Sequence, residues 1–236
     1  MASLVGSRVE RKEDKRFLTG KGRYTADINI ANQTHAYFVR SPHARAKISK
    51  IDIDKASKAK GVVKILTGED IVKDKIGGLI AGWKIVSEDG KDMKVPPQPP
   101  LANNSVNYVG EHIAVVIAET LDEAKNAAEL VKVDYKVLKA VVSTENAMNE
   151  KAIHEGIDKN LCFDFLLGDR AKTNEAFQNA DKVIKIDLNN NRLIPNAMEP
   201  RAAIGDYNSS TEEITLYTTS QNPHLSRLIM SAFNAV

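Results

Sequence analysis

The sequence predicts a mixed α/β (α+β) protein. Three observations support this class: short apolar or alternating runs typical of strands, an amphipathic helix directly after the most apolar run, and a second set of strand patterns nearer the C-terminus. Strands alternate with helices over roughly the first 140 of the 236 residues, so one mixed domain is expected there. A hydrophobic content of 42% is ordinary for a soluble globular chain.

The first strands are expected between residues 34 and 54. Residues 34–41 (THAYFVRS) have the aromatic and β-branched content of a strand, which Pro42 closes. Residues 46–54 (AKISKIDID) alternate isoleucine with polar residues, with a one-residue slip, and predict a second strand. Asp54 is then expected to cap a short helix, because its carboxylate can accept a backbone N–H of the first turn.

A third strand is expected at residues 62–68 (VVKILTG), and Thr67 or Gly68 then starts a short helix that ends near Val72. Residues 75–100 contain two consecutive glycines, a charged tip and PPQPP. That composition predicts a long loop, extended at the prolines.

The strongest strand signal is residues 111–119 (EHIAVVIAE). An amphipathic helix is expected over residues 121–133, and a further strand over residues 131–142. The buried face of that helix is predicted to carry Leu121, Ala124, Ala128 and Val131.

A polar stretch around residues 143–160 is expected to link this domain to a second one. Asp169 is placed to cap a helix, and residues 183–190 (VIKIDLNN) predict a new strand. Residues 190–233 then predict a strand, a turn, another strand, a polar corner and an amphipathic helix. About 56 residues from Asp181 onward would bury only a marginal core, so this second domain is expected to be incomplete.

Composition excludes several partners. With 33 basic and 31 acidic residues the net charge of +2 gives no argument for nucleic acid or an anionic membrane surface. The longest apolar run, Ile113–Ala118, is too short to span a bilayer, and charges within Met1–Lys15 argue against a signal peptide. The single cysteine, Cys162, fits a reducing, cytoplasmic setting and is interpreted as a buried small hydrophobic residue.

Common catalytic motifs are missing. The sequence has no phosphate-binding glycine loop, no HExxH or CxxC spacing, and no GxSxG elbow. His43 is interpreted as a turn histidine bonded to backbone, and Glu111 and His112 as edge residues of a strand. Glu199 is interpreted as one partner in a charge-paired corner with Arg201, rather than as a catalytic carboxylate.

Gln221 is the one candidate site residue. Ser220, Gln221 and Asn222 lie at an expected helix start with Pro223 in the first helical position, a place suited to an anion or a metal-oxo group. An amide side chain can donate and accept hydrogen bonds at once. The local pattern alone favours a plain helix cap made by Ser220 or Asn222.

Long co-linear motifs suggest a family. RVERKEDKRFLTGKGRYTADI, FVRSPHARAKI, GVVKILTGEDI, PPLANNSVNYVGEHIAVVIAET and NNRLIPNAMEPRAA…LYTTSQNPH together resemble the molybdopterin-binding large subunit of the xanthine dehydrogenase and aldehyde oxidase family, most closely its aerobic carbon monoxide dehydrogenases. The resemblance implies an N-terminal arm (1–19), an α/β hammerhead domain (20–140), a linker (141–164) and the start of the first molybdopterin-binding domain (165–236).

In such subunits the glutamine matched by Gln221 lies beside the molybdenum and hydrogen-bonds one of its oxygen ligands, so the resemblance favours a cofactor contact over a plain cap. NAMEPRA is implied to support the site structurally. No catalytic residue is expected within these 236 residues. The family's GGGFG segment, its active-site loop and its catalytic glutamate are not found here, so the chain alone is expected to be inactive.

The resemblance also implies cofactors and partners. They are a molybdenum-molybdopterin cofactor in its cytosine dinucleotide form, FAD and 2Fe–2S clusters on a medium and a small partner subunit, and copper in a member that oxidises carbon monoxide. The implied reaction is hydroxylation with water as the oxygen source. Two alternatives stay open: a non-catalytic assembly protein that docks through an exposed helix at Leu225–Phe233, and a family member that oxidises an aldehyde or an N-heterocycle.

Overall fold

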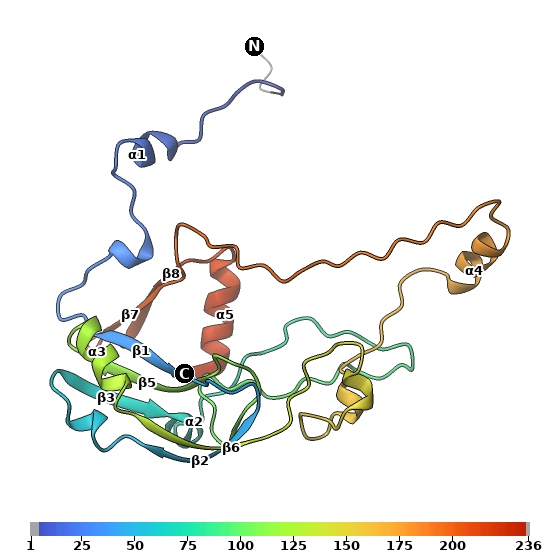
Figure 1. Cartoon of the computed structure of the whole chain (residues 1–236). Helices are drawn as coiled ribbons and strands as arrows, with labels where there is room; N and C mark the ends of the chain where they lie inside the picture. The colour runs from blue at the N-terminus through green and yellow to red at the C-terminus, as the bar shows by residue number, and fades with distance from the viewer. Residues whose placement is uncertain (1–4, 235–236) are drawn as a thin grey trace. The chain divides into compact units, whose positions relative to one another are not determined.

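The computed structural model describes residues 5–234 (Figure 1), with side chains up to residue 231. The described residues form two compact units. The larger comprises Thr34–Asp187 and the residues from Arg227 onward; the smaller comprises the residues up to Gln33 and Leu188–Ser226. Two three-stranded sheets belong to the larger unit and a two-stranded sheet belongs to the smaller one, which confirms the mixed α/β class.

The first sheet has the order β1-β5-β3, with both pairings antiparallel. Its strands are β1 (His35–Arg40), β5 (His112–Ala118) and β3 (Val62–Thr67). The central strand β5 is buried on both faces: Ala114 and Val116 join one core cluster, whereas Ile113 joins another. Burial on both faces explains why this run is continuously apolar instead of alternating.

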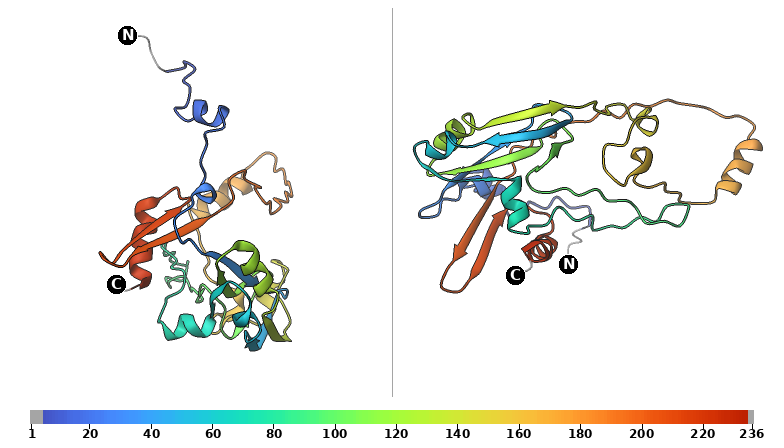
Figure 2. Two further views of the ribbon diagram at one scale, coloured as in Figure 1. Left: turned by 90° about the vertical axis from the view of Figure 1, so that its left-hand side faces the viewer. Right: turned by 90° about the horizontal axis from the view of Figure 1, so that it is seen from below.

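Helix α3 (Leu121–Ala128) packs on this sheet (Figure 2). The Thr120 hydroxyl caps it by accepting the Glu123 N–H at 3.2 Å. Ala124 and Ala128 are buried as predicted, and Ala127 is buried as well. The placement of Leu121 on the buried face was wrong, because its side chain is 42% exposed. At 100° per residue, Leu121 points about 70° away from the centre of the face that the three buried alanines form.

The second sheet has the order β4-β2-β6 and is also antiparallel. Its strands are β4 (Ser105–Val106), β2 (Ala46–Asp52) and β6 (Lys132–Val137). The β2–β6 register shifts between Ile48 and Lys50, which confirms the slip expected from the sequence. The two-residue strand β4 was not predicted, because so short a run carries no periodic signal.

Two short helical segments flank β3. Helix α2 (Gly68–Lys73) begins as predicted, since Thr67 donates its N–H and its hydroxyl to the Asp70 carboxylate at 2.8 and 3.0 Å. The turn η2 (Ala56–Lys58) has Lys55 rather than Asp54 at its cap position. The prediction that the Asp54 carboxylate caps this turn was wrong. The Asp54 N–H donates to the Asp52 carboxylate, and the Asp54 carbonyl, rather than its side chain, accepts a hydrogen bond from the Ser57 hydroxyl.

Residues 75–100 are mostly irregular, as predicted, and fold back on themselves at a bridge between Val86 and Asp92. The tip is tied to a later segment: the Arg170 guanidinium lies 2.6 Å from the Glu88 carboxylate, and the Lys94 N–H donates to the Cys162 carbonyl. Cys162 is half-buried, so the interpretation as a buried small hydrophobic residue holds only in part.

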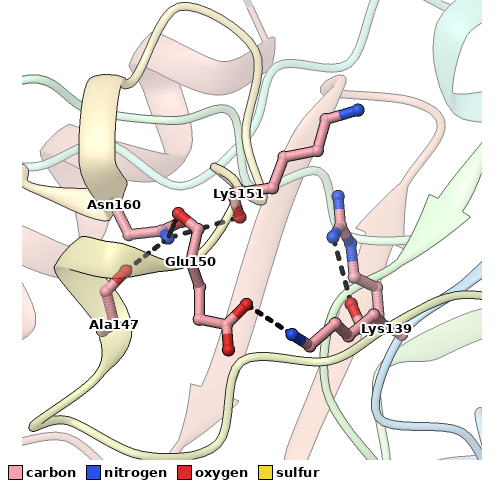
Figure 3. Close-up of polar contacts among 6 residues, drawn as sticks. Lys139, Ala147, Glu150, Lys151 and Asn160 are labelled. Carbon is pink, nitrogen blue, oxygen red and sulfur yellow. Dashed lines mark hydrogen bonds and ion pairs between the residues drawn. The ribbon is translucent and has the colours of Figure 1, made fainter.

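The polar stretch after β6 is held by side-chain to backbone hydrogen bonds (Figure 3). It contains the turns η3 (Ala147–Asn149) and η4 (Asp158–Asn160). The Asn160 amide donates to the Ala147 carbonyl at 2.8 Å and, at 3.3 and 3.4 Å, to the Glu150 and Lys151 carbonyls that follow the turn. Its oxygen accepts the Ile153 N–H at 2.8 Å. Arg45 donates to the Lys139 and Ile153 carbonyls, so this stretch is fastened to the sheet region.

Helix α4 (Arg170–Gln178) begins where the sequence predicted, because the Asp169 carboxylate accepts the Lys172 N–H at 3.0 Å. The strand predicted at residues 183–190 is not formed within the described chain. A strand needs a neighbour for its backbone groups, and no described segment pairs with this one.

The smaller unit contains α1 (Asp14–Leu18), the turn η1 (Thr25–Asp27) and a hairpin of β7 (Ala203–Asn208) and β8 (Glu213–Thr218), which Figure 2 shows as paired arrows. The hairpin and the following helix α5 (Pro223–Asn234) confirm the strand-turn-strand-helix prediction. Side chains of residues 232–236, including Phe233 of the expected docking helix, lie outside the described part. Among the described residues, no helix combines the length and apolar character that crossing a membrane requires.

Candidate functional site

The candidate site is the corner that joins β8 to α5. β8 ends at Thr218 and α5 begins at Pro223, so four residues make the turn from strand to helix. Pro223 occupies the first helical position, as expected, where its missing N–H costs no hydrogen bond. A helix start also carries partial positive charge from its free N–H groups, which favours anionic or oxygen-rich ligands nearby.

Ser220 and Ser226 hold the corner against the first turn of α5. The Ser220 hydroxyl accepts the Asn222 N–H at 3.1 Å and lies 3.0 Å from the Ser226 hydroxyl. Ser226 in turn donates to the Asn222 carbonyl at 3.1 Å. The cap expected from Ser220 or Asn222 is therefore a short hydrogen-bond network that uses the Ser220 hydroxyl. This network makes no hydrogen bond to the side chain of Gln221.

Gln221 lies at the bend of this corner with an exposed side chain. Within the described chain its amide group has no hydrogen-bond partner, although its neighbours on both sides are bonded. Its N–H₂ donors and its carbonyl acceptor are both open for a ligand. This donor set fits a group that presents oxygen or other polar atoms, which is the chemistry expected of a molybdopterin cofactor.

Glu199 connects a second segment to the corner. Its carboxylate accepts the Thr219 hydroxyl at 3.1 Å, and the Thr218 hydroxyl donates to the Ala202 carbonyl at 3.2 Å. The expected pairing of Glu199 with Arg201 was wrong: no ion pair joins them in the described structure. An exposed ion pair gains little in water, so a hydroxyl donor held close by the hairpin replaces it.

The other residues considered from the sequence have structural partners in the larger unit. The Ser41 hydroxyl accepts the His43 N–H and donates to the His43 carbonyl, and the His43 ring meets Tyr135 edge-on at 4.8 Å. His43 thus has a local structural role, as predicted, but its bonds run from its backbone to the Ser41 side chain. Burial raises the pKa of Tyr135 above its ordinary value.

Glu111 and His112 also act locally. The Glu111 carboxylate accepts the Asn107 N–H, and the His112 ring stacks on Phe38 with centroids 4.4 Å apart. Burial, and to a lesser degree the nearby Arg40 charge, lower the pKa of His112. No group of three or more His, Cys, Asp or Glu residues in the described chain could hold a metal ion.

Sequence reasoning missed the roles of Thr219 and Ser226. Thr219 and Glu199 are twenty positions apart, and no local pattern links them; only the hairpin brings them together. Ser226 follows the corner at helical spacing from Asn222, so a serine at the fourth position after the cap was the one available signal.

Comparison with known proteins adds a family to this geometry. Residues 19–139 match the family model of the aldehyde oxidase and xanthine dehydrogenase a/b hammerhead domain, and residues 153–236 match that of the molybdopterin cofactor-binding domain. Gln221 and Glu199 both fall within the second match.

Sequence relatives and solved structures of this family align with nearly the whole chain. The nicotine 6-hydroxylase large subunit of Paenarthrobacter nicotinovorans is 33% identical, covering 98% of this chain and 28% of the relative. The carbon monoxide dehydrogenase large chain of Afipia carboxidovorans is 30% identical, covering 98% and 29%. The structure of quinoline 2-oxidoreductase from Pseudomonas putida 86 superposes with a TM-score of 0.83 at 30% identity, over 98% of this chain and 29% of the other. The chain thus spans less than a third of the length of these proteins.

Proposed function

Because the chain belongs to the aldehyde oxidase and xanthine dehydrogenase family, we propose that it forms the hammerhead domain and part of the cofactor wall of a molybdenum hydroxylase large subunit. The observation that carries this proposal is the exposed amide of Gln221, which has no hydrogen-bond partner within the described chain and lies beside a corner backbone that Ser220 and Ser226 hold. That corner lies within the molybdopterin-binding match.

Gln221 is proposed to hydrogen-bond the cofactor. Ser220 and Ser226 would keep the backbone of the corner in one conformation, and Thr219 would anchor it to Glu199, so that Gln221 is held in place while its amide stays open for the ligand. Once it is hydrogen-bonded to the cofactor, the amide would be held as a dipole that stabilises developing charge, which is how such a residue would contribute to turnover. The bound molybdenum cofactor would supply two-electron oxidation of the substrate, with water as the oxygen source.

We further propose the setting of this site. The cofactor is the molybdopterin cytosine dinucleotide form, and electrons leave through 2Fe–2S clusters and FAD on a small and a medium partner subunit, in a cytoplasmic complex. The chain by itself is expected not to reduce dyes, because the resemblance assigns it one cofactor contact, Gln221, and no catalytic residue.

Two substrate classes are proposed. Carbon monoxide comes first, because the sequence motifs resemble those of carbon monoxide dehydrogenases. The large chain of one such enzyme is 30% identical over 98% of this chain. Copper would then be needed beside the molybdenum. An aromatic N-heterocycle comes second, because two relatives are named for such substrates. They are the nicotine 6-hydroxylase large subunit, at 33% identity, and quinoline 2-oxidoreductase, with a TM-score of 0.83.

The test is to purify this chain with the polypeptides that copurify with it and to measure molybdenum, iron and flavin. Dye reduction is then followed with carbon monoxide, an aldehyde and an N-heterocycle. Gln221→Ala is expected to lower kcat about 100- to 1,000-fold, as loss of one donor to developing charge does. Gln178→Ala, an exposed amide at the end of α4, serves as the matched control and should leave kcat unchanged.

Three outcomes would contradict the proposal. They are a complex without molybdenum, equal activity of Gln221→Ala and the Gln178→Ala control, and a stable complex that contains no redox cofactor at all. The last result would favour the non-catalytic assembly protein. For that alternative, Leu225 and Leu228 of α5 are 52% and 63% exposed and would form the docking face.

A further inference from the structure

The tip of the long loop, residues 87–91 (SEDGK), is a closed turn. The Ser87 N–H donates to the Lys91 carbonyl at 2.8 Å, and the Gly90 N–H donates to the Ser87 carbonyl at 2.9 Å. Gly90 has a φ of +78°, a conformation that glycine adopts without steric cost. The turn is held by its own backbone, so its closure depends on the number of backbone atoms between Ser87 and Lys91.

A later segment of the larger unit is fastened to this tip. The Glu88 N–H donates to the Asp164 carbonyl at 3.0 Å, and the Asp164 N–H donates to the Ser87 hydroxyl at 3.2 Å. The Glu88 carboxylate also pairs with Arg170, the first residue of α4. The geometry of the tip therefore determines how the segment that leads into α4 is held.

The tip contains Asp89–Gly90, the one Asp-Gly or Asn-Gly pair in the 236 residues. Aspartate before glycine is prone to isoaspartate formation, because glycine has no side chain to hinder ring closure. The Gly90 nitrogen forms a bond to the side-chain carboxyl carbon of Asp89, and the carboxyl OH leaves with the amide proton as water. Water then opens the five-membered imide: attack at the side-chain carbonyl restores aspartate, and attack at the main-chain carbonyl leaves isoaspartate. The sequence of steps needs water alone, with no oxidant, reductant or added group.

Lys91 holds the Asp89 carboxylate in a form that resists this reaction. The Lys91 ammonium lies 2.7 Å from one carboxylate oxygen, and the Lys91 N–H donates to the other at 3.0 Å. These two hydrogen bonds, that of the side chain first, hold the pKa of Asp89 below its ordinary value. Hydroxide leaves from a protonated carboxyl group far more readily than oxide leaves from a carboxylate, so an ionised Asp89 closes the ring slowly. The attacking Gly90 nitrogen is also engaged, because its N–H is bonded within the turn.

We propose that Asp89 is a site of isoaspartate formation, that Lys91 keeps the reaction slow, and that the modification releases residues 162–170 from the tip. An isoaspartate carries the main chain through its side-chain CH₂ group, which adds one backbone atom between Ser87 and Lys91. The turn then cannot keep both of its backbone hydrogen bonds. Glu88, next to the modified residue, loses its alignment with the fastened segment.

The rate of modification tests the role of Lys91. The full chain, purified with the polypeptides that copurify with it, is incubated at constant temperature and sampled over time. Peptide mass spectrometry with electron-transfer fragmentation distinguishes isoaspartate from aspartate and measures the modified fraction at Asp89. Lys91→Ala is expected to raise the initial rate about two- to fivefold, the change that corresponds to loss of an exposed ion pair. Lys94→Ala removes the same charge outside the turn and should leave the rate unchanged.

Two further measurements separate ring closure from a general loosening of the loop. Asp89→Glu keeps a carboxylate but would have to close a six-membered ring, which forms far more slowly, so no modified peptide should accumulate at that position. The unchanged chain in urea, where the turn is lost, should react faster than the folded chain. The proposal is contradicted by equal rates in the folded and unfolded chain, by equal rates in Lys91→Ala and Lys94→Ala, or by an Asp89 that stays unmodified in Lys91→Ala.

Hydrogen exchange tests the release, with modified and unmodified chains separated by chromatography. The amides of Glu88 and Asp164 bond across the contact, and both should exchange about 2- to 10-fold faster in the modified chain. The Ile153 amide, which the Asn160 side chain holds away from the tip, is the internal control and should not change. Exchange of Glu88 and Asp164 at the same rate in both forms would overturn the release, as would an equal rise at Ile153.

Discussion

The two units of this chain differ in what holds their residues in place. In the larger unit Val106, Ile113 and Val116 are fully buried, and three core clusters surround its sheets. In the smaller unit every residue of the β7–β8 hairpin except Ile204 is exposed. The candidate chemistry nevertheless lies at the end of that hairpin. Packing therefore defines the fold of one unit, whereas a few side-chain hydrogen bonds define the site in the other.

The largest expected contrast comes from one substitution made in each unit. Ile113→Ala removes a fully buried side chain from β5, and it should lower the free energy of unfolding by about 2–5 kcal/mol. Ile214→Ala in β8, where the side chain is 64% exposed, should change it by less than about 0.5 kcal/mol. Urea unfolding followed by circular dichroism measures both, and similar losses for the two variants would break the comparison.

A smaller effect is expected where hydrogen bonds, not packing, order part of the larger unit. Asn160→Gly deletes the amide that bonds four backbone groups while still allowing its φ of +55°. We expect a loss of about 1–3 kcal/mol from the groups left unpaired. Hydrogen exchange at the Ile153 amide should accelerate first, since that N–H loses its acceptor. Asn189→Ala, an exposed asparagine, is the control and should change neither quantity.

Thr219→Val sharpens the distinction at the candidate site. It removes the hydroxyl that donates to Glu199 but keeps the shape of the side chain. Global stability should change by less than about 0.5 kcal/mol. Exchange of the Asn222 amide, which donates to Ser220, should rise about 2- to 10-fold as the corner loosens. Thr215→Val on the same strand, a threonine without such a bond, should leave exchange unaltered; an identical rise there would argue against a specific anchor.

The smallest expected effect is a pH dependence confined to the larger unit. Because burial and Arg40 lower the pKa of His112, the folded state favours its neutral form. That stability is fully present above the ordinary pKa of about 6.5 and is lost as pH falls below it. The free energy of unfolding should therefore fall between about pH 7.5 and 5.5. His112→Phe, which keeps an aromatic ring against Phe38, should flatten this slope, whereas His35→Phe should not.

Local sequence signals were sufficient where one segment carries its own reason to fold. The run Ile113–Ala118 predicts a strand because every residue in it can be buried, and it is the central strand of the first sheet. Thr67 and Asp169 were recognised as helix starts because each side chain accepts or donates within its own first turn. Pro223 marks the start of α5 for the same local reason.

Predictions failed where a residue depends on a distant partner. Residues 183–190 have the alternation of a strand but find no neighbour in the described chain, so alternation alone did not produce one. Glu199 was assigned to Arg201, its neighbour in sequence, because Thr219 could not be known to lie beside it. The order within residues 147–160 was missed as well, because it depends on one asparagine that bonds backbone groups up to thirteen positions away.

For the candidate site, the Ser-Gln-Asn-Pro run after a strand placed Gln221 before a helix, because that run is a local signal, and the family resemblance of the sequence singled Gln221 out as a cofactor contact. Tertiary structure alone decided that the Ser220 hydroxyl and the Asn222 backbone N–H are bonded to each other while the Gln221 amide has no partner in the described chain. It also decided that Glu199 supports the corner. The physical reason is range: caps and periodicity act within a few residues, whereas hydrogen bonds between segments exist only after the backbone has brought their atoms within about 3 Å.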